Sequence, residues 1–338
     1  MNGKRWLALG IAVILFFFSL GVNFLTSLAF NNEDDWRFSW MEEMNKEFTE
    51  TIIEEGSEFG SIVVLDVNGV IQDTGEIGAF FESPTYNHRK FLKMLQNAGE
   101  DDSVKGIIIR VNSPGGGVSE SAELHDRIVD IQENYSKPIY ISMGSMAASG
   151  GYYISAPADK IFASPETLTG SLGVIMQGIN YAQLAEKYGV KFETIKSGEH
   201  KDIMSPTREI TDEERRILQE MVDNSYEGFV DVIVNGRNMS PDKVREIADG
   251  RIYDGRQAKE LGLIDEFGYL DETIAAMKDL EEVGDVSVVR YGVSFGFDSL
   301  FSSMSQHLFV GDLDFELTNI SNMLSQPNSP RLMYLYAR

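Results

Sequence analysis

Two kinds of hydrophobic pattern alternate along the middle of the chain. Short apolar runs, rich in β-branched residues, predict buried strands, and segments with apolar residues at helical spacing lie between them. A regular exchange of strands and helices is typical of a layered α/β fold. The predicted strands are residues 61–71, 104–111, 137–144, 159–164 and 190–197, and the first predicted helices are residues 88–98 and 121–134.

The C-terminal part of this body becomes helical. Thr211 and Glu214 have the spacing of a capping box, which predicts the start of a long helix with one apolar stripe. Two short helices are predicted at residues 240–250 and 254–262. The pattern weakens after about residue 292, and the chain ends in the apolar tail "PNSPRLMYLYAR". The stripe of the long helix comprises Ile217, Leu218, Met221, Val222, Phe229, Val232 and Ile233.

An uncharged stretch of 25 residues, Trp6 to Phe30, precedes the body. A helix of that length can cross a hydrocarbon core of about 30 Å. Lys4 and Arg5 lie before it and "NNEDD" follows, so the positive-inside rule places the N-terminus in the cytoplasm. A cleaved signal peptide is the alternative, because Ser27 and Ala29 form a small-x-small site. The stretch exceeds the usual apolar region of about 7–15 residues, however, which favours a retained single-pass membrane anchor and an extracytoplasmic body.

Charge and composition argue against several classes of function. From residue 31 onward the chain carries 27 basic and 53 acidic side chains, a net charge of −26, which should repel nucleic acid and anionic lipid. There are no cysteines, so disulfides and thiolate metal sites are excluded. The chain also lacks a P-loop, and its histidines are not at metal-ligand spacing. We therefore expect no cofactor, no metal and no nucleic-acid partner. The histidines are His88, His125, His200 and His307.

A serine among small residues is the first candidate for chemistry. "SMAASGGYY" places Ser149 after a predicted strand and before a predicted helix. Backbone N–H groups at a helix N-terminus, with Gly150 among them, stabilise negative charge. The segment "NSPGGG", residues 112–117, follows the preceding strand, and its glycine amides can contribute to an oxyanion hole. The plain alternatives are a serine in tight helix packing and an ordinary strand-to-helix turn.

A nucleophilic serine needs a base, and the residues alone leave three candidates open. His200 adjoins Lys201 in "KSGEHKD", which begins with Lys196. Histidine is the usual base of a serine triad. A lysine can replace it where burial and dryness lower the lysine pKa towards neutrality. Nothing in the local pattern chooses between His200, Lys196 and Lys201.

Four motifs, in this order and spacing, resemble the Ser/Lys peptidases of the S49 family: "VNSPGGG", "SMAASGGYYIS", "TLTGSLGVI" and "SGEHKDIMSPTRE". The likeness covers about residues 60–292 and is specific to the short, membrane-anchored form of Gram-positive bacteria. "DGRQAKELGLIDEFG" also resembles a segment of the wider Clp protease/crotonase superfamily. The resemblance implies an α/β fold of stacked β-β-α units with a helical C-terminal part, assembled into a homo-oligomeric ring or dome.

The expected domains follow from the patterns and the resemblance together. They are a transmembrane anchor at residues 1–30, an acidic stalk at 31–58, an S49-type peptidase domain at 59–292 and a C-terminal extension with the apolar tail at 293–338.

The resemblance also implies roles at the site. Ser149 matches the nucleophile and Lys201 the general base, which demotes His200. In an extended stretch, neighbouring side chains point to opposite faces, so His200 would face away from Ser149. The other expected site residues are the oxyanion donors Gly116 and Gly150, with Gly115 as an alternative, and Ser171 in "TGSLG", which would orient the lysine amine.

The implied function is a serine endopeptidase, anchored in the cell membrane, that degrades remnant signal peptides and other unfolded apolar peptides outside the cytoplasm. One alternative is a non-catalytic protein that sequesters apolar or antimicrobial peptides at the membrane. The other is a crotonase-like acyl-CoA enzyme, against which the anchor and the acidic body argue.

Two further expectations concern assembly and the tail. In two-copy members of the family the lysine and the serine come from different halves, whereas this chain has one copy with Ser149 and Lys201 52 positions apart. The resemblance therefore implies that neighbouring subunits share each site, and a dyad within one chain is the alternative. We also expect the apolar tail to dock in a groove of the peptidase or to be trimmed by it; simple packing on the body is the alternative.

Overall fold

The computed structural model describes residues 15–19, 22, 48–74, 86–293 and 332–336. The chain divides into two compact units, residues 1–47 and 48–338. Within the described ranges, no helix is both long enough and apolar enough to cross a membrane. Most of the predicted anchor and of the predicted stalk lies outside the described residues, as does His307.

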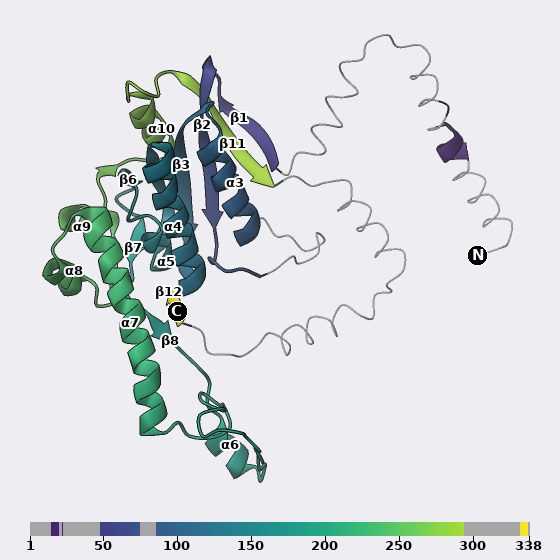
Figure 1. The fold of residues 1–338 in the computed structure, drawn as a ribbon, viewed down its shortest axis with the longest axis vertical. Coiled ribbons are helices and arrows are strands. Elements are labelled where there is room, and N and C mark those ends of the chain that lie inside the picture. Colours follow the sequence, from purple (N-terminus) through teal and green to yellow (C-terminus); the bar gives the residue numbers. More distant parts are fainter. Residues whose placement is uncertain (1–14, 20–21, 23–47, 75–85, 294–331, 337–338) are drawn as a thin grey trace. The chain divides into compact units, whose positions relative to one another are not determined.

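Nine strands of the described residues form one sheet at the centre of the second unit (Figure 1). They are β1 (Phe48–Glu54), β2 (Ser57–Asn68), β3 (Val104–Ser113), β5 (Ile139–Ala148), β6 (Lys160–Ala163), β7 (Leu168–Gly170), β9 (Ile252–Asp254), β10 (Glu266–Phe267) and β11 (Val286–Val293). The main path runs β1-β11-β2-β3-β5-β6-β10, with β7 beside β5 and β9 beside β7. Adjacent strands are parallel except in the pairs β1–β11 and β7–β9.

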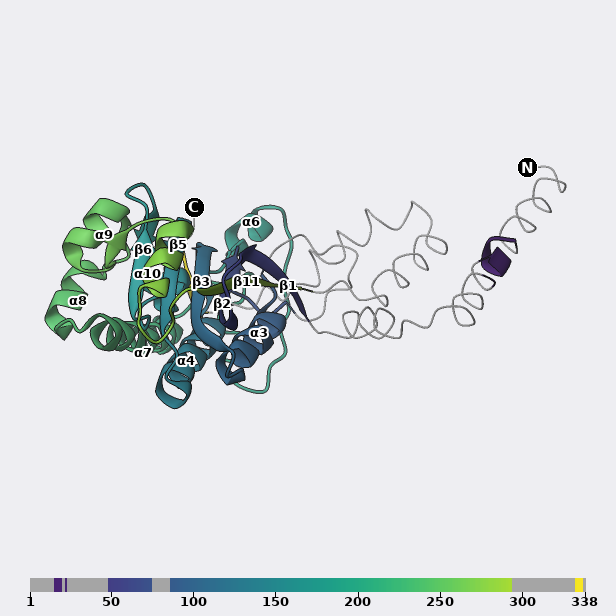
Figure 2. The same ribbon diagram turned by 90° about the horizontal axis from the view of Figure 1, so that it is seen from above.

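Helices cover both faces of this sheet. The helices of the second unit within the described residues are α3 (His88–Glu100), α4 (Val118–Tyr135), α5 (Gly150–Tyr153), α6 (Ala182–Lys187), α7 (Asp212–Arg237), α8 (Pro241–Ile247), α9 (Gly255–Leu261) and α10 (Leu270–Lys278), of which α6 lies away from the sheet. Val63 and Leu65 of β2 join the apolar cluster that includes α3 and α4, whereas Ile62 and Val64 join the cluster that includes α10. Figure 2 shows α10 on one side of the strands and α3 and α4 on the other. Burial on both faces explains why the strand segments read as continuous apolar runs. The predicted α/β class is confirmed, with a largely parallel sheet.

A second, smaller sheet involves the C-terminal tail. It contains β4 (Gly115–Gly117), β12 (Leu332–Leu335) and β8 (Ile175–Met176). The tail strand β12 lies between the other two and is antiparallel to both. Through β4 it pairs with the glycine turn that directly follows β3, where the sequence predicts part of the site.

The capping box that predicts the start of α7 is confirmed, because Thr211 Oγ1 accepts from the Glu214 N–H and the Glu214 carboxylate accepts from the Thr211 N–H. The predicted apolar stripe is buried only in the second half of the helix, at Phe229, Val232 and Ile233. Ile217 and Met221 in the first half are exposed. The sequence pattern was correct for the helix, but one chain buries only part of its apolar face.

The predicted strand at residues 190–197 is wrong. These residues have no regular secondary structure, and all of them are exposed. They belong to residues 177–211, here called the arm, which joins β8 to α7 and carries α6. Figure 1 shows α6 beyond the end of α7 that lies farthest from the sheet. An isolated strand there has no neighbour to supply ladder hydrogen bonds, so the alternating apolar pattern produces exposed side chains instead.

Candidate active site

Ser149 occupies the junction between β5 and α5. Its backbone has φ 53° and ψ −116°, a conformation that costs a non-glycine residue on the order of 1–3 kcal/mol. Hydrogen bonds on both sides hold it there: its N–H donates to Gly170 O at 2.7 Å, and its carbonyl accepts from the N–H groups of Tyr152 and Tyr153 at 2.9 Å. Strain that the surrounding structure holds in place is typical of a functional residue.

The structure brings Ser171 next to Ser149. Parallel pairing of β5 with β7 aligns Ala148 with Gly170, so the two serines follow directly paired residues. Ser171 also has a positive φ, 51°, and its N–H donates to Arg251 O at 2.7 Å. Both side chains are buried. Among the described residues, the Ser149 hydroxyl has no hydrogen-bond partner.

The glycine turn after β3 contains Gly116, a predicted oxyanion donor, and Gly115, the alternative to it. The Gly115 N–H is already used, because it donates to Ser113 Oγ at 3.0 Å. A Cβ atom on Gly150 would lie 3.1 Å from the Gly116 nitrogen, so these two backbones are in close contact. A Cβ on Gly116 would lie 1.9 Å from Ile71 O, which explains why glycine is required. Closeness does not separate the two, since a Cβ on Gly115 would lie 2.7 Å from the Gly150 nitrogen; the engaged N–H of Gly115 is what favours Gly116 as the partner of Gly150.

The tail strand β12 places a peptide carbonyl against these glycines. Tyr334 is paired with Gly116 in the antiparallel register. A Cβ on Gly150 would lie 3.1 Å from Tyr334 O, and a Cβ on Gly115 would lie 2.0 Å from the same oxygen. The Tyr334 carbonyl thus lies where the backbones of Gly116 and Gly150 meet, the position expected of a substrate carbonyl in an oxyanion hole. Residues 332–336 thus lie in a groove between β4 and β8, as expected if the tail docks on the peptidase, whereas trimming stays a prediction.

The side chain of Tyr334 fills an aromatic pocket. Its ring stacks on Tyr153 with centroids 4.8 Å apart and contacts Phe229 at 4.7 Å. Its hydroxyl donates to Ser225 O at 2.9 Å, and the residue is 2% exposed. Burial raises the pKa of Tyr334 well above its ordinary value, so the hydroxyl stays neutral. The pocket therefore fits a neutral aromatic side chain.

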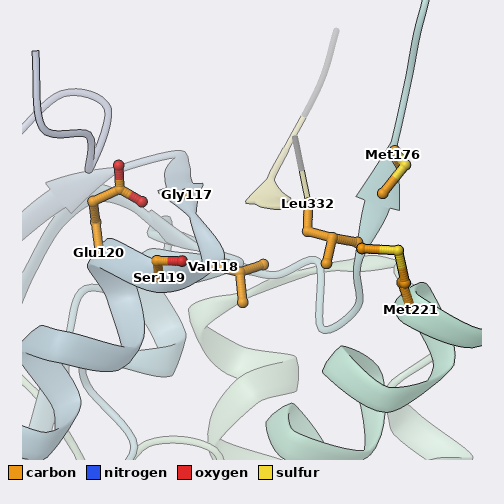
Figure 3. Close-up of a pocket in the computed structure, with 7 residues that line it drawn as sticks. All are labelled: Gly117, Val118, Ser119, Glu120, Met176, Met221 and Leu332. Carbon is orange, nitrogen blue, oxygen red and sulfur yellow. The ribbon is translucent and has the colours of Figure 1, made fainter. Parts of the chain in front are cut away.

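A cavity of about 400 Å³ continues the groove beside Leu332 (Figure 3). Figure 3 shows the Leu332 side chain directed towards Met221 of α7, with Val118 at the start of α4 nearby. The wall is mixed: Val118, Met176 and Met221 supply apolar surface beside Leu332, and Ser119 and Glu120 supply polar surface. The lining residues are Gly117, Val118, Ser119, Glu120, Met176, Met221 and Leu332.

The arm carries the three candidate bases, and the structure distinguishes between them. Residues 199–204 form a series of turns, so the expectation that His200 faces away in an extended stretch does not apply. The Lys196 Nζ donates to Asp202 Oδ1 at 2.7 Å, and His200 Nδ1 lies 3.8 Å from Glu214 Oε1. Lys201 is exposed, and within the described part of the chain it has no ion pair or side-chain hydrogen bond.

Within one chain, the structure brings four of the five predicted site residues together and leaves the fifth apart. Gly116 and Gly150 lie against Tyr334, and Ser149, which directly precedes Gly150, lies next to Ser171 through the pairing of Ala148 with Gly170. Lys201 lies on the arm, which extends away from the sheet (Figure 1), and it does not bond to the Ser149 hydroxyl.

Sequence reasoning missed three residues that support the site without being among its predicted members. Ser113 holds the glycine turn through its hydroxyl, and Tyr153 and Phe229 form the aromatic pocket. The Ser-Pro-Gly sequence was a usable signal for Ser113, because a serine hydroxyl often bonds a backbone N–H two residues on. The pocket gave no local signal, since its two aromatic residues are 76 positions apart in the sequence.

Comparisons with known proteins agree with this geometry. The profile of peptidase family S49 matches residues 132–284. A protein of Enterococcus faecium with the provisional name signal peptide peptidase SppA is 44% identical over 86% of this chain and 85% of its own length. Protease 4 of Salmonella typhi is 33% identical over 66% of this chain but only 35% of its own length. The chloroplastic serine protease SPPA of Arabidopsis thaliana is 35% identical over 56% of this chain and 28% of its own length. The chain therefore belongs to peptidase family S49 and is a serine peptidase.

Proposed function

We propose that this peptidase cuts extended apolar peptides, with Ser149 as nucleophile and Lys201 of a neighbouring copy as general base. The observation that carries the proposal is the docked tail. A peptide strand from the chain itself lies antiparallel to β4, with the Tyr334 carbonyl oxygen against Gly116 and Gly150, the Tyr334 ring in the aromatic pocket and Leu332 beside the cavity. Backbone pairing gives affinity for any extended peptide, and the pockets select its side chains.

The reaction follows from these positions. The neutral Lys201 amine takes the Ser149 proton while the serine oxygen attacks the peptide carbonyl, and the N–H groups of Gly116 and Gly150 bind the oxyanion. The resulting ammonium then protonates the leaving amine as the C–N bond breaks. Water, deprotonated by the same amine, attacks the acyl-serine; as the ester C–O bond breaks, the ammonium returns its proton to the Ser149 oxygen and the acid product leaves. Ser171, beside Ser149, accepts a hydrogen bond from the amine and orients its lone pair.

A shared site explains why Lys201 has no side-chain partner among the residues of its own chain that the structure describes. An exposed ammonium is a poor base, and burial against a second copy would favour the neutral amine. The arm also exposes large apolar side chains, including Ile179 (78% exposed) and Tyr188 (75% exposed). Apolar surface of this kind is typical of a protein interface. A head-to-tail contact that repeats around a ring makes one site per interface, which fits the expected homo-oligomer.

We also propose that the substrates are remnant signal peptides and that the chain is anchored in the membrane by residues 1–30, with its body outside the cytoplasm. The provisional name of the Enterococcus faecium relative supports the substrate class. The uncharged 25-residue stretch behind Lys4 and Arg5 supports the anchor. The succession of a long strand, a short strand and a helix in β3, β4 and α4 supports the stacked β-β-α architecture.

A peptide with the sequence of residues 330–338 tests the function directly. We expect cleavage after the tyrosine that corresponds to Tyr334, because in the chain itself that carbonyl oxygen lies against Gly116 and Gly150. A control peptide with aspartate at that position should be cleaved at least 100-fold more slowly, since its carboxylate would be buried unpaired in the aromatic pocket. Mass spectrometry of the products checks both. Binding of the first peptide without cleavage would instead support a non-catalytic peptide-binding protein.

The tail of the intact protein gives a second prediction. We expect the active protein to lose residues 335–338, because the Tyr334 carbonyl already lies against the oxyanion donors. The Ser149→Ala variant should keep the full C-terminus. Intact-mass measurement of both proteins decides, and identical full-length C-termini would count against trimming.

A further inference from the structure

A cluster of four charged side chains ties the arm to the start of α7. It consists of Arg208, Asp202, Glu214 and Lys196 and is here called the arm cluster. It lies directly beside Lys201 in the sequence, yet the reaction described above assigns it no step. Two carboxylates face two cations, so the arm cluster has no net charge.

Arg208 is the centre of the arm cluster. Its Nε donates to Asp202 Oδ2 at 2.9 Å and its Nη2 to Asp202 Oδ1 at 2.7 Å. The same guanidinium donates through Nη1 to Glu214 Oε2 at 2.8 Å and through Nη2 to Glu214 Oε1. Two bidentate pairs use the planar fork of arginine in a way that lysine cannot reproduce.

The far side of the cluster is rigid. Glu214 is the third residue of α7, its side chain is 2% exposed, and its carboxylate also accepts from the Thr211 N–H at 3.0 Å. Arg208 therefore fixes the turn that carries Asp202 to the first turn of a 26-residue helix. Lys201 precedes Asp202 directly, so its backbone is fixed by the same contacts.

The cluster also keeps a carboxylate away from Lys201. Asp202 is the nearest carboxylate to Lys201 in the sequence, and a bonded carboxylate would hold the lysine ammonium in its charged form. Arg208 and Lys196 occupy both Asp202 oxygens. Of the other charged neighbours, Glu209 accepts from Gln183 and His200 lies 3.8 Å from Glu214. The Glu199 side chain is exposed and has no ion pair or hydrogen bond among the described residues, although its backbone carbonyl accepts from Lys196.

We propose that Arg208 is a positioning residue for catalysis, which locks the turn that bears Lys201 and holds Asp202 away from the lysine amine. This inference rests on the proposed role of Lys201 as the base.

Hydrogen bonds from Arg208 keep both carboxylates ionised. They lower the pKa of Glu214 to about 2 and that of Asp202 well below its ordinary value. A lowered carboxylate pKa stabilises the folded arm at every pH above the unfolded value and loses that effect only as pH falls through the folded one. The ion pairs of Arg208 with Asp202 and Glu214 therefore persist throughout the neutral and alkaline pH range in which a lysine base works.

The test compares the kinetics of Arg208→Met with those of the wild type, on assembled protein and with the peptide of residues 330–338. We expect kcat to fall about 10- to 100-fold with KM changed less than about threefold, because the turn is displaced while the groove is intact. We also expect the alkaline rise of kcat to move to higher pH, since Asp202 can then pair with Lys201. Adding Asp202→Asn should move that rise back, a rescue that a purely structural defect would not show.

Three further variants make the outcome decisive. Arg245→Met removes a similar exposed pair, with Glu227, away from the arm and should leave the kinetics unchanged. Arg208→Lys keeps the positive charge but cannot form both bidentate pairs, so its kcat should lie between those of the wild type and Arg208→Met. This variant keeps the proposal testable if Arg208→Met does not assemble. Lys201→Ala must be inactive. An active Lys201→Ala would refute the proposed base itself, whereas an inactive one beside an Arg208→Met with wild-type kcat and pH profile would overturn only the positioning role.

Discussion

Replacing Ser149 with alanine should abolish peptide hydrolysis, with kcat lower by about 10⁴-fold or more. Loss of the nucleophile in a serine peptidase leaves only the weak catalysis that the oxyanion hole and substrate binding provide. The fold should stay intact, because the Ser149 hydroxyl has no hydrogen-bond partner among the described residues. Its removal therefore leaves no other polar group without a partner. We expect the free energy of unfolding to change by less than about 0.5 kcal/mol.

The same strand offers a matched control. Ser142 of β5 is also buried, and its hydroxyl likewise has no partner within the described ranges. Ser142→Ala makes the identical chemical change seven positions away, so it should keep full activity. Turnover of Ser149→Ala that matches turnover of Ser142→Ala would refute the assignment of the nucleophile.

Replacing Lys201 with alanine should lower kcat by about 10²- to 10⁴-fold, the usual contribution of a general base. His200→Ala should lose little, because His200 of the arm faces Glu214 of α7. Since the amine must be neutral to accept the proton, the wild-type rate should rise with pH, and the residual rate of Lys201→Ala should lack that rise. A dead His200→Ala beside an active Lys201→Ala would reverse the assignment. Steady-state kinetics over a range of pH on the three proteins gives the answer.

Local pattern was sufficient for the parts of the fold whose signals are local. The apolar runs that became β2, β3 and β5 and the capping box of α7 could be identified because strand burial and helix capping depend on neighbouring residues. The strand predicted at residues 190–197 failed because an alternating pattern does not reveal whether a partner strand exists. The pattern there is better explained by an exposed apolar arm.

The site shows the same limit. Ser149 and the glycine turn could be identified because small residues at strand ends form a local signature. The pairing of Ser149 with Ser171 depends on the register of β5 with β7, and the aromatic pocket depends on contacts between α5 and α7. The place of Tyr334 depends on a strand that returns from the far end of the chain. Such long-range contacts leave no periodic trace in the sequence.

The central claim is that one chain holds half of each site. Activity of mixed subunits tests it most directly: Ser149→Ala and Lys201→Ala proteins are dissociated, combined and reassembled, with subunit exchange verified by mass. If a neighbouring copy supplies the lysine, some interfaces pair an intact Ser149 with an intact Lys201, and activity should return to roughly a quarter of the wild-type value for equal random mixing. If each chain completes its own site, every subunit remains inactive. A silent mixture with verified exchange would contradict the shared site.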